Sequence, residues 1–256
     1  MSLRAREIIR SRTKSAAGIS TNAGARALCF VLAALAFLLF CPFSTIPGAG
    51  AQGPDGLPVS ESNKEKARAY NIEGIKLQSQ GKFNDAVQSY KKAIELNPQG
   101  GAYHNNLAVV LKDLNRWQEA ETEARIALKL KPDRADYHFN LGLILNGLKQ
   151  YEEAEKHFRD AIEINASDVE SRFRLAEILL RQSKFQDCEM QLKMALLLAP
   201  NEPRFHQLLA DAYLQQDKKE DALLEYKKVL ELNKDGTVDG AVTTRVEYLK
   251  QVLHSR

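Results

Sequence analysis

The sequence predicts an all-α solenoid of five 34-residue helix–turn–helix repeats, followed by a C-terminal capping helix. Three observations lead to this prediction. The chain resembles itself when it is shifted by 34 residues, small residues recur at fixed places of that period, and proline recurs where the second helix of a pair would end. A fixed period of about 20 to 50 residues is typical of stacked supersecondary units that bury a core only against their neighbours.

The repeats occupy residues 64–236, in the registers 67–100, 101–134, 135–168, 169–202 and 203–236. Small residues fill the eighth and twentieth places of each register. The eighth places are Gly74, Ala108, Gly142, Ala176 and Ala210, and the twentieth places are Ala86, Ala120, Ala154, Cys188 and Ala222. Small side chains at these places allow two antiparallel helices to approach closely, while larger residues fill the space around them.

The ends of the predicted helices carry stop and turn signals. The second helices are followed by Pro98, Pro132 and Pro200, and proline cannot continue a helix. The turns inside the pairs hold Gly81, Asn115, Ser183 and Asp217, residue types that tolerate tight turns. Ser62 and Glu65 match a capping box and are predicted to open the first helix.

Residues 237–256 are predicted to form a capping helix that covers the exposed face of the fifth repeat. Their apolar residues at helical spacing are Val238, Val242, Val246, Leu249, Val252 and Leu253. Gly240 is expected inside this helix at a cost of about 1 kcal/mol, so the helix should depend on docking.

This 34-residue pattern resembles the tetratricopeptide repeat family over about 170 residues. The places that depart from the family pattern are Glu73, Ala166, Lys219 and Lys234. The resemblance implies a right-handed superhelix whose first helices line a concave groove that binds other proteins.

The chain begins with a basic region, residues 1–26, and an apolar region, residues 27–46. Residues 1–46 carry a net charge of +5, so the remainder carries −2 of the total +3. The uncharged stretch 27–43 would rise about 25 Å as a helix, marginal for a hydrocarbon core of about 30 Å. We expect a transmembrane anchor or the hydrophobic region of a signal peptide, with the body on the non-cytoplasmic side.

The fate of this segment stays open at the sequence level. Ala49 and Ala51 form an A-x-A pattern suited to signal peptidase, whereas the long basic region suits an uncleaved anchor that contacts the membrane through residues 27–46. A bacterial envelope or periplasm is the expected location. A mitochondrial presequence is the alternative, because residues 1–26 are rich in Arg, Ser and Ala. Residues 47–63 form a Gly/Pro-rich linker.

The body carries no motif for chemistry, and we expect no enzyme activity, no cofactor and no small-molecule substrate. Its near-neutral charge disfavours nucleic acid as a partner. Cys188 is interpreted as a small buried filler. His104, His138 and His206 share the fourth place of their repeats, and equivalent places on packed helices lie about 8–10 Å apart. These three cannot share one ion, and no metal site is predicted.

The resemblance places the fifth and sixth residues of each repeat at the concave groove. The candidate peptide-binding residues there are Asn71, Asn105, Asn106, Phe139, Asn140, Phe173 and Arg174. Asparagine is a poor residue for a helix interior without a specific role, which favours a binding function.

Two functions follow from these observations. The favoured one is a non-catalytic scaffold or assembly adaptor at a membrane or in the cell envelope, which binds an extended peptide or a helix of another protein in the concave groove. The alternative is a regulatory, non-catalytic subunit of a membrane-bound enzyme complex that binds through the convex face.

Overall fold

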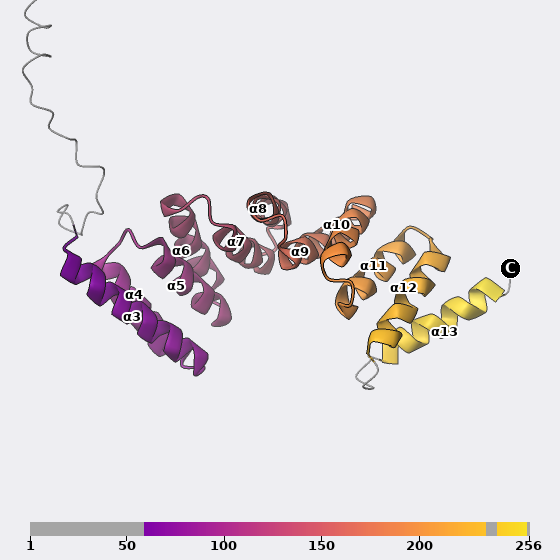
Figure 1. Ribbon diagram of the computed structural model, residues 1–256, viewed down its shortest axis with the longest axis horizontal. Helices are drawn as coiled ribbons and strands as arrows, with labels where there is room; N and C mark the ends of the chain where they lie inside the picture. Colours follow the sequence, from indigo (N-terminus) through magenta and orange to yellow (C-terminus); the bar gives the residue numbers. More distant parts are fainter. Residues whose placement is uncertain (1–58, 234–239, 255–256) are drawn as a thin grey trace, which may run out of the picture. The chain divides into compact units, whose positions relative to one another are not determined.

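The computed structural model describes residues 59–233 and 240–254, which all belong to the second of two compact units, Gly50–Arg256. Within these two stretches the backbone forms eleven helices and no strand (Figure 1). The first unit, Met1–Ala49, lies outside the described residues, and with it the whole of the predicted basic region, 1–26, and of the predicted anchor, 27–46. Among the described helices, none combines the length and the apolar character needed to cross a membrane.

Ten of these helices form five pairs, each joined by a short turn. The pairs are α3 (Glu61–Ser79) with α4 (Phe83–Leu96), α5 (Gly101–Asp113) with α6 (Trp117–Leu130), α7 (Ala135–Gly147) with α8 (Tyr151–Ile164), α9 (Val169–Arg181) with α10 (Phe185–Leu198), and α11 (Pro203–Gln215) with α12 (Lys219–Leu232). The last helix is α13 (Gly240–His254). The predicted all-α solenoid of five repeats and a final helix is confirmed.

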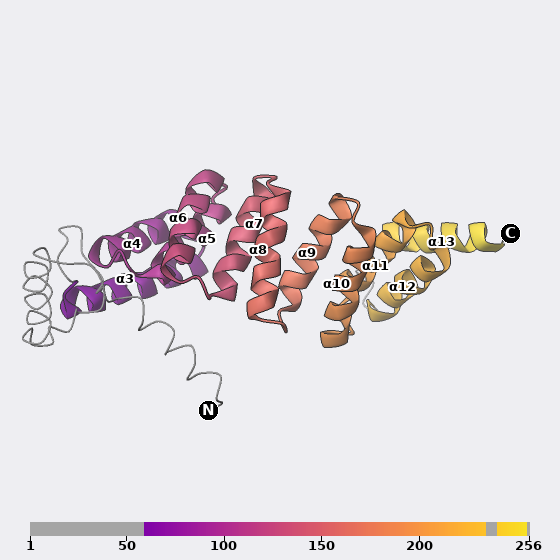
Figure 2. The same cartoon turned by 90° about the horizontal axis from the view of Figure 1, so that it is seen from above.

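The helix pairs follow one another in chain order (Figure 2), and each second helix also packs on the first helix of the next pair. Consecutive first helices, such as α5 and α7, contact each other, whereas consecutive second helices within residues 59–233 do not. The first helices therefore line the more closely packed side of the array. We call this side the first-helix face and the opposite side the second-helix face.

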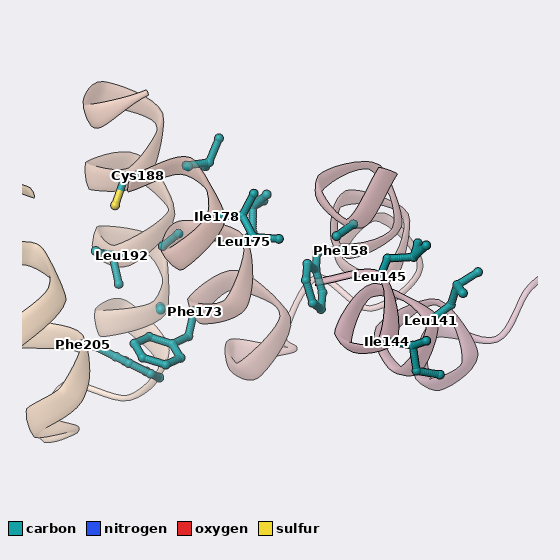
Figure 3. Packing of buried hydrophobic residues seen from close by; sticks show 14 of the residues in the cluster. Leu141, Ile144, Leu145, Phe158, Phe173, Leu175, Ile178, Cys188, Leu192 and Phe205 are labelled. Atoms are coloured by element: carbon teal, nitrogen blue, oxygen red, sulfur yellow. The ribbon is translucent and has the colours of Figure 1, made fainter. Parts of the chain in front are cut away.

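Small residues at the eighth place allow the two helices of a pair to approach. A Cβ added to Gly142 on α7 would lie 2.8 Å from Cε1 of Phe158 on α8, closer than real Cβ atoms come. Phe158 is fully buried in the core cluster shown in Figure 3. In the second repeat the matching places hold Ala108 and Ala124. A larger ring on one helix thus coincides with a glycine on the other, and the predicted role of the eighth place is confirmed for Gly142.

The turn inside every pair contains one residue with positive φ. These residues are Gly81 (73°), Asn115 (59°), Lys149 (63°), Ser183 (60°) and Asp217 (56°). The sequence analysis identified four of them and missed Lys149, because lysine is not a typical turn residue. The left-handed conformation is imposed by the fold and costs an ordinary side chain about 1–2 kcal/mol.

Replacing Lys149 by glycine is expected to raise the free energy of unfolding by about 0.5–1 kcal/mol, because glycine adopts positive φ without steric cost but loses more backbone entropy. The converse change, Gly81→Ala, should lower it by about 1 kcal/mol. No atom lies within 4 Å of a Cβ added at Gly81, so the effect of Gly81→Ala reports the cost of the backbone conformation and not a steric clash with a neighbour. Urea unfolding followed by circular dichroism measures both. Equal stability of Lys149→Gly and the parent would contradict the strain argument.

The first helix begins earlier than the predicted capping box. α3 starts at Glu61, and Ser60 is its N-cap, with Oγ accepting a hydrogen bond from the backbone N–H of Asn63 at 3.2 Å. Ser62 lies inside the first turn, so the prediction that Ser62 opens the helix was wrong. Ser60 takes this role because its extended backbone turns the hydroxyl toward the free N–H groups of the first turn.

The last helix, α13, docks on the fifth repeat as predicted. Val242, Val246 and Leu249 are buried in the core cluster, and α13 contacts α12. The guanidinium of Arg245 donates to Asp211 at 2.6 Å and to the hydroxyl of Tyr226 at 3.0 Å. Gly240 is the first residue of α13 and not an interior one, so the expected interior cost does not arise. Val238 lies outside the described residues.

Candidate functional site

Two pairs of asparagine side chains connect the first helices α3, α5 and α7. Asn106 donates an Nδ2 hydrogen to Oδ1 of Asn71, and Asn140 donates one to Oδ1 of Asn105, both at 2.9 Å. Each hydrogen bond joins successive first helices through residues 35 apart in the chain. The four predicted asparagines are thus brought together as a row of amides across three repeats.

The pair of Asn71 and Asn106 keeps most of its hydrogen-bonding capacity. A carboxamide offers two donor hydrogens and one acceptor oxygen. The bond between the two side chains occupies one hydrogen of Asn106 and the oxygen of Asn71. Three amide hydrogens and the oxygen of Asn106 make no other side-chain hydrogen bond within the described part of the chain. Both residues are partly exposed, so these groups can reach a ligand.

Aliphatic side chains lie on the same helices as the amides. Ile72 and Ile75 on α3 are 65% and 50% exposed, and Val109 on α5 is partly exposed. Exposed aliphatic residues that gather beside polar groups are typical of interaction sites, whereas single ones are common on any surface. The N-terminal part of the first-helix face therefore combines amides with uncovered apolar surface.

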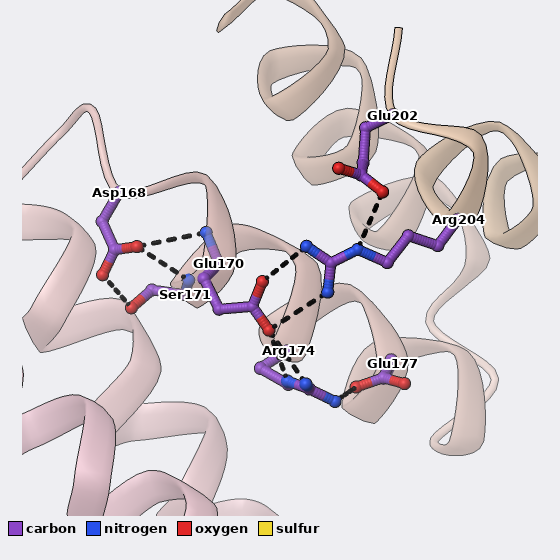
Figure 4. Close-up of polar contacts among 7 residues, drawn as sticks. All are labelled: Asp168, Glu170, Ser171, Arg174, Glu177, Glu202 and Arg204. Atoms are coloured by element: carbon purple, nitrogen blue, oxygen red, sulfur yellow. Dashed lines mark hydrogen bonds and ion pairs between the residues drawn. The ribbon is translucent and has the colours of Figure 1, made fainter. Parts of the chain in front are cut away.

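The C-terminal part of this face is charged. Arg174 on α9 donates to Glu170 at 2.9 Å and to Glu177 at 3.0 Å. Glu170 also accepts a hydrogen bond from Arg204 of α11 at 2.9 Å (Figure 4). Asp168 caps α9 beside this network by accepting from the backbone N–H groups of the first turn. Arg174 is partly exposed but already paired, so a ligand must compete for it or bind the network as a whole.

Two of the predicted contact residues lie in the interior. Asn105 and Phe173 are each only 7% exposed. The Phe173 ring packs 5.2 Å from the ring of Phe205, and the guanidinium of Arg204 covers it at 5.0 Å. Asn105 accepts a hydrogen bond from Asn140, and Phe173 lies beneath Arg204, so both are largely covered by their neighbours, and their direct contact with a ligand stays a prediction. Phe139 is partly buried and meets Phe158 edge-on, with centroids 5.8 Å apart.

The second-helix face carries a separate feature, a cleft of about 740 Å³ between α10, α11 and α12. Its apolar lining includes Leu196, Leu197, Leu209 and Leu232. Beside it, Met190, Met194 and Leu197 form a stripe along α10, with exposed fractions of 50%, 42% and 77%. An apolar stripe of this kind on a second helix was not among the predicted site residues.

Comparison with known families confirms the repeat assignment. Four sequence profiles of the tetratricopeptide repeat match the chain, over residues 76–115, 110–169, 145–211 and 203–235, which together span more than half of it. The chain belongs to the tetratricopeptide repeat family. A comparison with curated protein sequences gives no significant match.

Solved tetratricopeptide repeat proteins share this fold. YrrB is described as having an unusual peptide-binding site. Its sequence is 22% identical to this chain and the TM-score is 0.62; the match covers 75% of this chain and 95% of the YrrB chain. PilF of Pseudomonas aeruginosa is 22% identical with a TM-score of 0.66, and the match covers 76% of this chain and 87% of the PilF chain. MamA of Desulfovibrio magneticus RS-1 is 21% identical with a TM-score of 0.63, and the match covers 68% of this chain and 98% of the MamA chain. At these identities the likeness establishes the fold and no function.

The fourth place of the tetratricopeptide repeats forms a polar network that the sequence analysis missed. His104 and His206 each place Nε2 near a carbonyl oxygen of the preceding repeat, and Nδ1 at 2.6 Å from Glu123 and Glu225 respectively. The guanidinium of Arg172 likewise donates to Oε1 of Gln191 and to the backbone oxygen of Ala166 in the preceding repeat. These residues tie neighbouring repeats together. The complementary residues at the fourth and twenty-third places of the second, fourth and fifth repeats were the signal that could have revealed this role.

The third tetratricopeptide repeat departs from this pattern. His138 faces His157 where the second and fifth repeats have glutamate, and the two Nδ1 atoms are 3.0 Å apart. Burial, and after it the neighbouring His138, lowers the pKa of His157, while Asp160 and Glu153 oppose this effect. The neutral imidazole is therefore the favoured form of His157 in the folded protein.

Cys188 shows no sign of reactivity. It is fully buried at a twentieth place, and burial raises the pKa of its thiol to about 12. A thiol with such a pKa is protonated near neutral pH and is a poor nucleophile. The predicted role as a small buried residue is confirmed for Cys188.

Proposed function

We propose that this protein is a non-catalytic scaffold that binds an extended peptide of another protein along the first-helix face of α3, α5 and α7. The row of paired asparagines is the observation that carries the proposal. Tetratricopeptide repeats are interaction scaffolds, and the solved relative YrrB is described as having a peptide-binding site. The chemistry of this face agrees with a peptide as the ligand.

The spacing of the first helices suits an extended peptide. Packed helices lie about 8–10 Å apart, and an extended chain advances about 3.3 Å per residue, so successive repeats would meet about every third peptide residue. The pair of Asn71 and Asn106 offers both donors and an acceptor, as one peptide unit requires. Asn140 repeats this on the next helix. Recognition through the backbone tolerates different ligand sequences.

Side-chain preference would come from the surroundings of the amides. Ile72, Ile75 and Val109 present aliphatic surface at the N-terminal end, which favours apolar ligand side chains there. The network of Glu170, Arg174 and Arg204 presents both charges at the other end. We therefore infer a ligand segment that is apolar at one end and polar or charged at the other.

We further propose that the scaffold acts at a membrane or in the cell envelope. This part rests on the sequence alone, from the basic region 1–26 and the uncharged stretch 27–43. A mitochondrial location remains the alternative, for the composition of residues 1–26.

The double variant Asn106→Ala with Asn140→Ala tests the groove. It should weaken binding of the partner peptide by about 1–3 kcal/mol, since each lost hydrogen bond contributes about 0.5–1.5 kcal/mol. The partner is first identified by affinity capture from membranes and mass spectrometry, and its binding segment is then titrated by calorimetry. Lys156→Ala, an exposed change on α8, is the control and should bind like the parent.

The second-helix face provides the competing function, a regulatory subunit that docks on an enzyme complex. The exposed stripe of Met190, Met194 and Leu197 beside the cleft is the observation that favours it. Leu197→Ser serves as the matched variant, because Leu197 is 77% exposed and its loss should leave the fold unchanged. If Leu197→Ser abolishes binding while the asparagine variant binds like the parent, the ligand occupies the second-helix face and the groove proposal fails.

A further inference from the structure

Three potential metal ligands converge inside the third repeat. His138 comes from α7, and His157 and Asp160 come from α8. The Nδ1 atoms of the two histidines are 3.0 Å apart, and Oδ2 of Asp160 lies 3.5 Å from the first and 3.7 Å from the second. Two imidazoles and a carboxylate are ligands that zinc and other divalent transition metals prefer.

The spacing of these three atoms fits an ion once the hydrogen between the two Nδ1 atoms has moved to Nε2 of His157. Ligands bound tetrahedrally to zinc at about 2.0–2.1 Å lie about 3.3–3.4 Å from one another, close to the mean of the three observed distances. The circle through three points with these separations has a radius of about 2.0 Å. An ion just off the plane of the three atoms would therefore meet all of them at an ordinary bond length.

Outer contacts prepare the two imidazoles for this role. His138 Nε2 lies 3.0 Å from the backbone oxygen of Pro132, which can only accept, so this nitrogen carries the hydrogen and Nδ1 keeps its lone pair. His157 Nε2 lies 3.9 Å from a carboxylate oxygen of Glu153. A histidine that ligates through one nitrogen and directs the other toward a carbonyl or carboxylate is the usual second-shell arrangement of metal sites.

We propose that the third repeat binds one divalent transition-metal ion of the zinc type through His138 Nδ1, His157 Nδ1 and Asp160 Oδ2. Three protein ligands leave a fourth position for water or for a side chain of a partner. The Asp160 side chain is 32% exposed and the two histidine side chains 14% and 13%, so the ion can enter from the solvent beside Asp160. This site is independent of the peptide-binding proposal.

The other repeats show that these residues are not simply required by the fold. At the fourth and twenty-third places the second and fifth repeats pair histidine with glutamate, and the fourth repeat pairs Arg172 with Gln191. Only the third repeat combines two histidines there, and it alone has an acid at the twenty-sixth place, where the others have Lys92, Ile126, Met194 and Lys228. Arg125, whose charge acts on His157, is paired with Glu121 and Glu153.

The test uses the full chain in detergent, stripped of metal with a chelator and titrated with Zn²⁺. We expect about one ion per chain by calorimetry and a rise in melting temperature that grows with the Zn²⁺ concentration. His157→Gln and Asp160→Asn should each weaken binding by at least about 100-fold, since the loss of an outer-shell partner alone costs about 10–100-fold. His157→Gln is compatible with the fold because Gln191 occupies the same place in the fourth repeat, and Asp160→Asn keeps the shape of the side chain.

His104→Gln is the control, since it removes a histidine of the second repeat at the fourth place, which His138 occupies in the third repeat. It should leave Zn²⁺ affinity unchanged. Cys29 and Cys41 are present in every variant, so zinc held by those thiols would persist in His157→Gln and Asp160→Asn. The proposal is overturned if the parent and these two variants bind Zn²⁺ equally, or if the parent binds none. Unchanged circular dichroism and melting temperature in chelator establish that the variants are folded.

Discussion

Replacing Phe158 by alanine is expected to lower the free energy of unfolding by about 3–5 kcal/mol. Phe158 of α8 is fully buried, and its ring lies directly over Gly142 of α7, which has no side chain to fill the space that the ring would leave. Urea unfolding of the full chain measures the effect. Ile164→Ala on the same helix is the control, because Ile164 is 45% exposed and should cost less than about 1 kcal/mol.

A second substitution distinguishes lost packing from other causes. Adding Gly142→Ala to Phe158→Ala recreates the combination of Ala108 and Ala124 in the second repeat, and should recover about 1 kcal/mol by filling part of the cavity and favouring the helix. In the parent background, Gly142→Ala should instead destabilise by about 1–3 kcal/mol, because its Cβ would overlap the Phe158 ring. If Gly142→Ala changes the free energy of unfolding in the same direction in both backgrounds, the proposed contact between Gly142 and Phe158 is contradicted.

The fold was predictable because its determinants are local and repeated. Every pair uses small residues at the eighth place, a positive-φ turn and a fixed period, so errors at single places do not alter the outcome. Lys149 illustrates this: it is a poor turn residue, yet it adopts φ 63° because the helices on both sides impose it. The start of α3 was less predictable, since Ser60 and Ser62 are both good caps and local geometry selects between them.

The first-helix face was predictable as a region but not as a set of contacts. The period places Asn106 and Asn140 at equivalent positions, which suggests that they face the ligand separately. In the structure each is bonded to the fifth-place residue of the preceding repeat, because the packing of successive first helices offsets them by one residue. The burial of Phe173 under Arg204 depends in the same way on a residue 31 places away that no pattern links to it.

The histidines show how a comparison limited to one place misleads. Only His104, His138 and His206 were compared, and as they lie in different repeats, a shared metal site was excluded. The ligands that converge on His138 come from the second helix of its own repeat, at the twenty-third and twenty-sixth places. Helix pairing brings residues 19 to 22 apart into contact, a spacing that a comparison of equivalent places does not reveal.

Removal of residues 237–256 is expected to destabilise the fifth repeat and to make the protein self-associate. Val242, Val246 and Leu249 on α13 are between 1% and 3% exposed, and full burial of each such side chain contributes about 1.5–3 kcal/mol. Their loss therefore removes roughly 4–9 kcal/mol, as an upper estimate. It also uncovers the apolar side of α12 and deprives Asp211 and Tyr226 of Arg245. Urea unfolding and light scattering measure the two effects.

A pair of point substitutions in α13 makes this prediction specific to docking. Val246→Asp places a carboxylate on the buried side of the helix and should cost more than about 3 kcal/mol, since a buried charge loses its hydration. Thr243→Asp introduces the same residue in place of a side chain of similar size on the exposed side, and should change stability by no more than about 0.5 kcal/mol. Equal stability of the two variants would show that α13 does not pack on the fifth repeat in solution. If Val246→Asp alone self-associates, the exposed face of the fifth repeat is what the final helix protects.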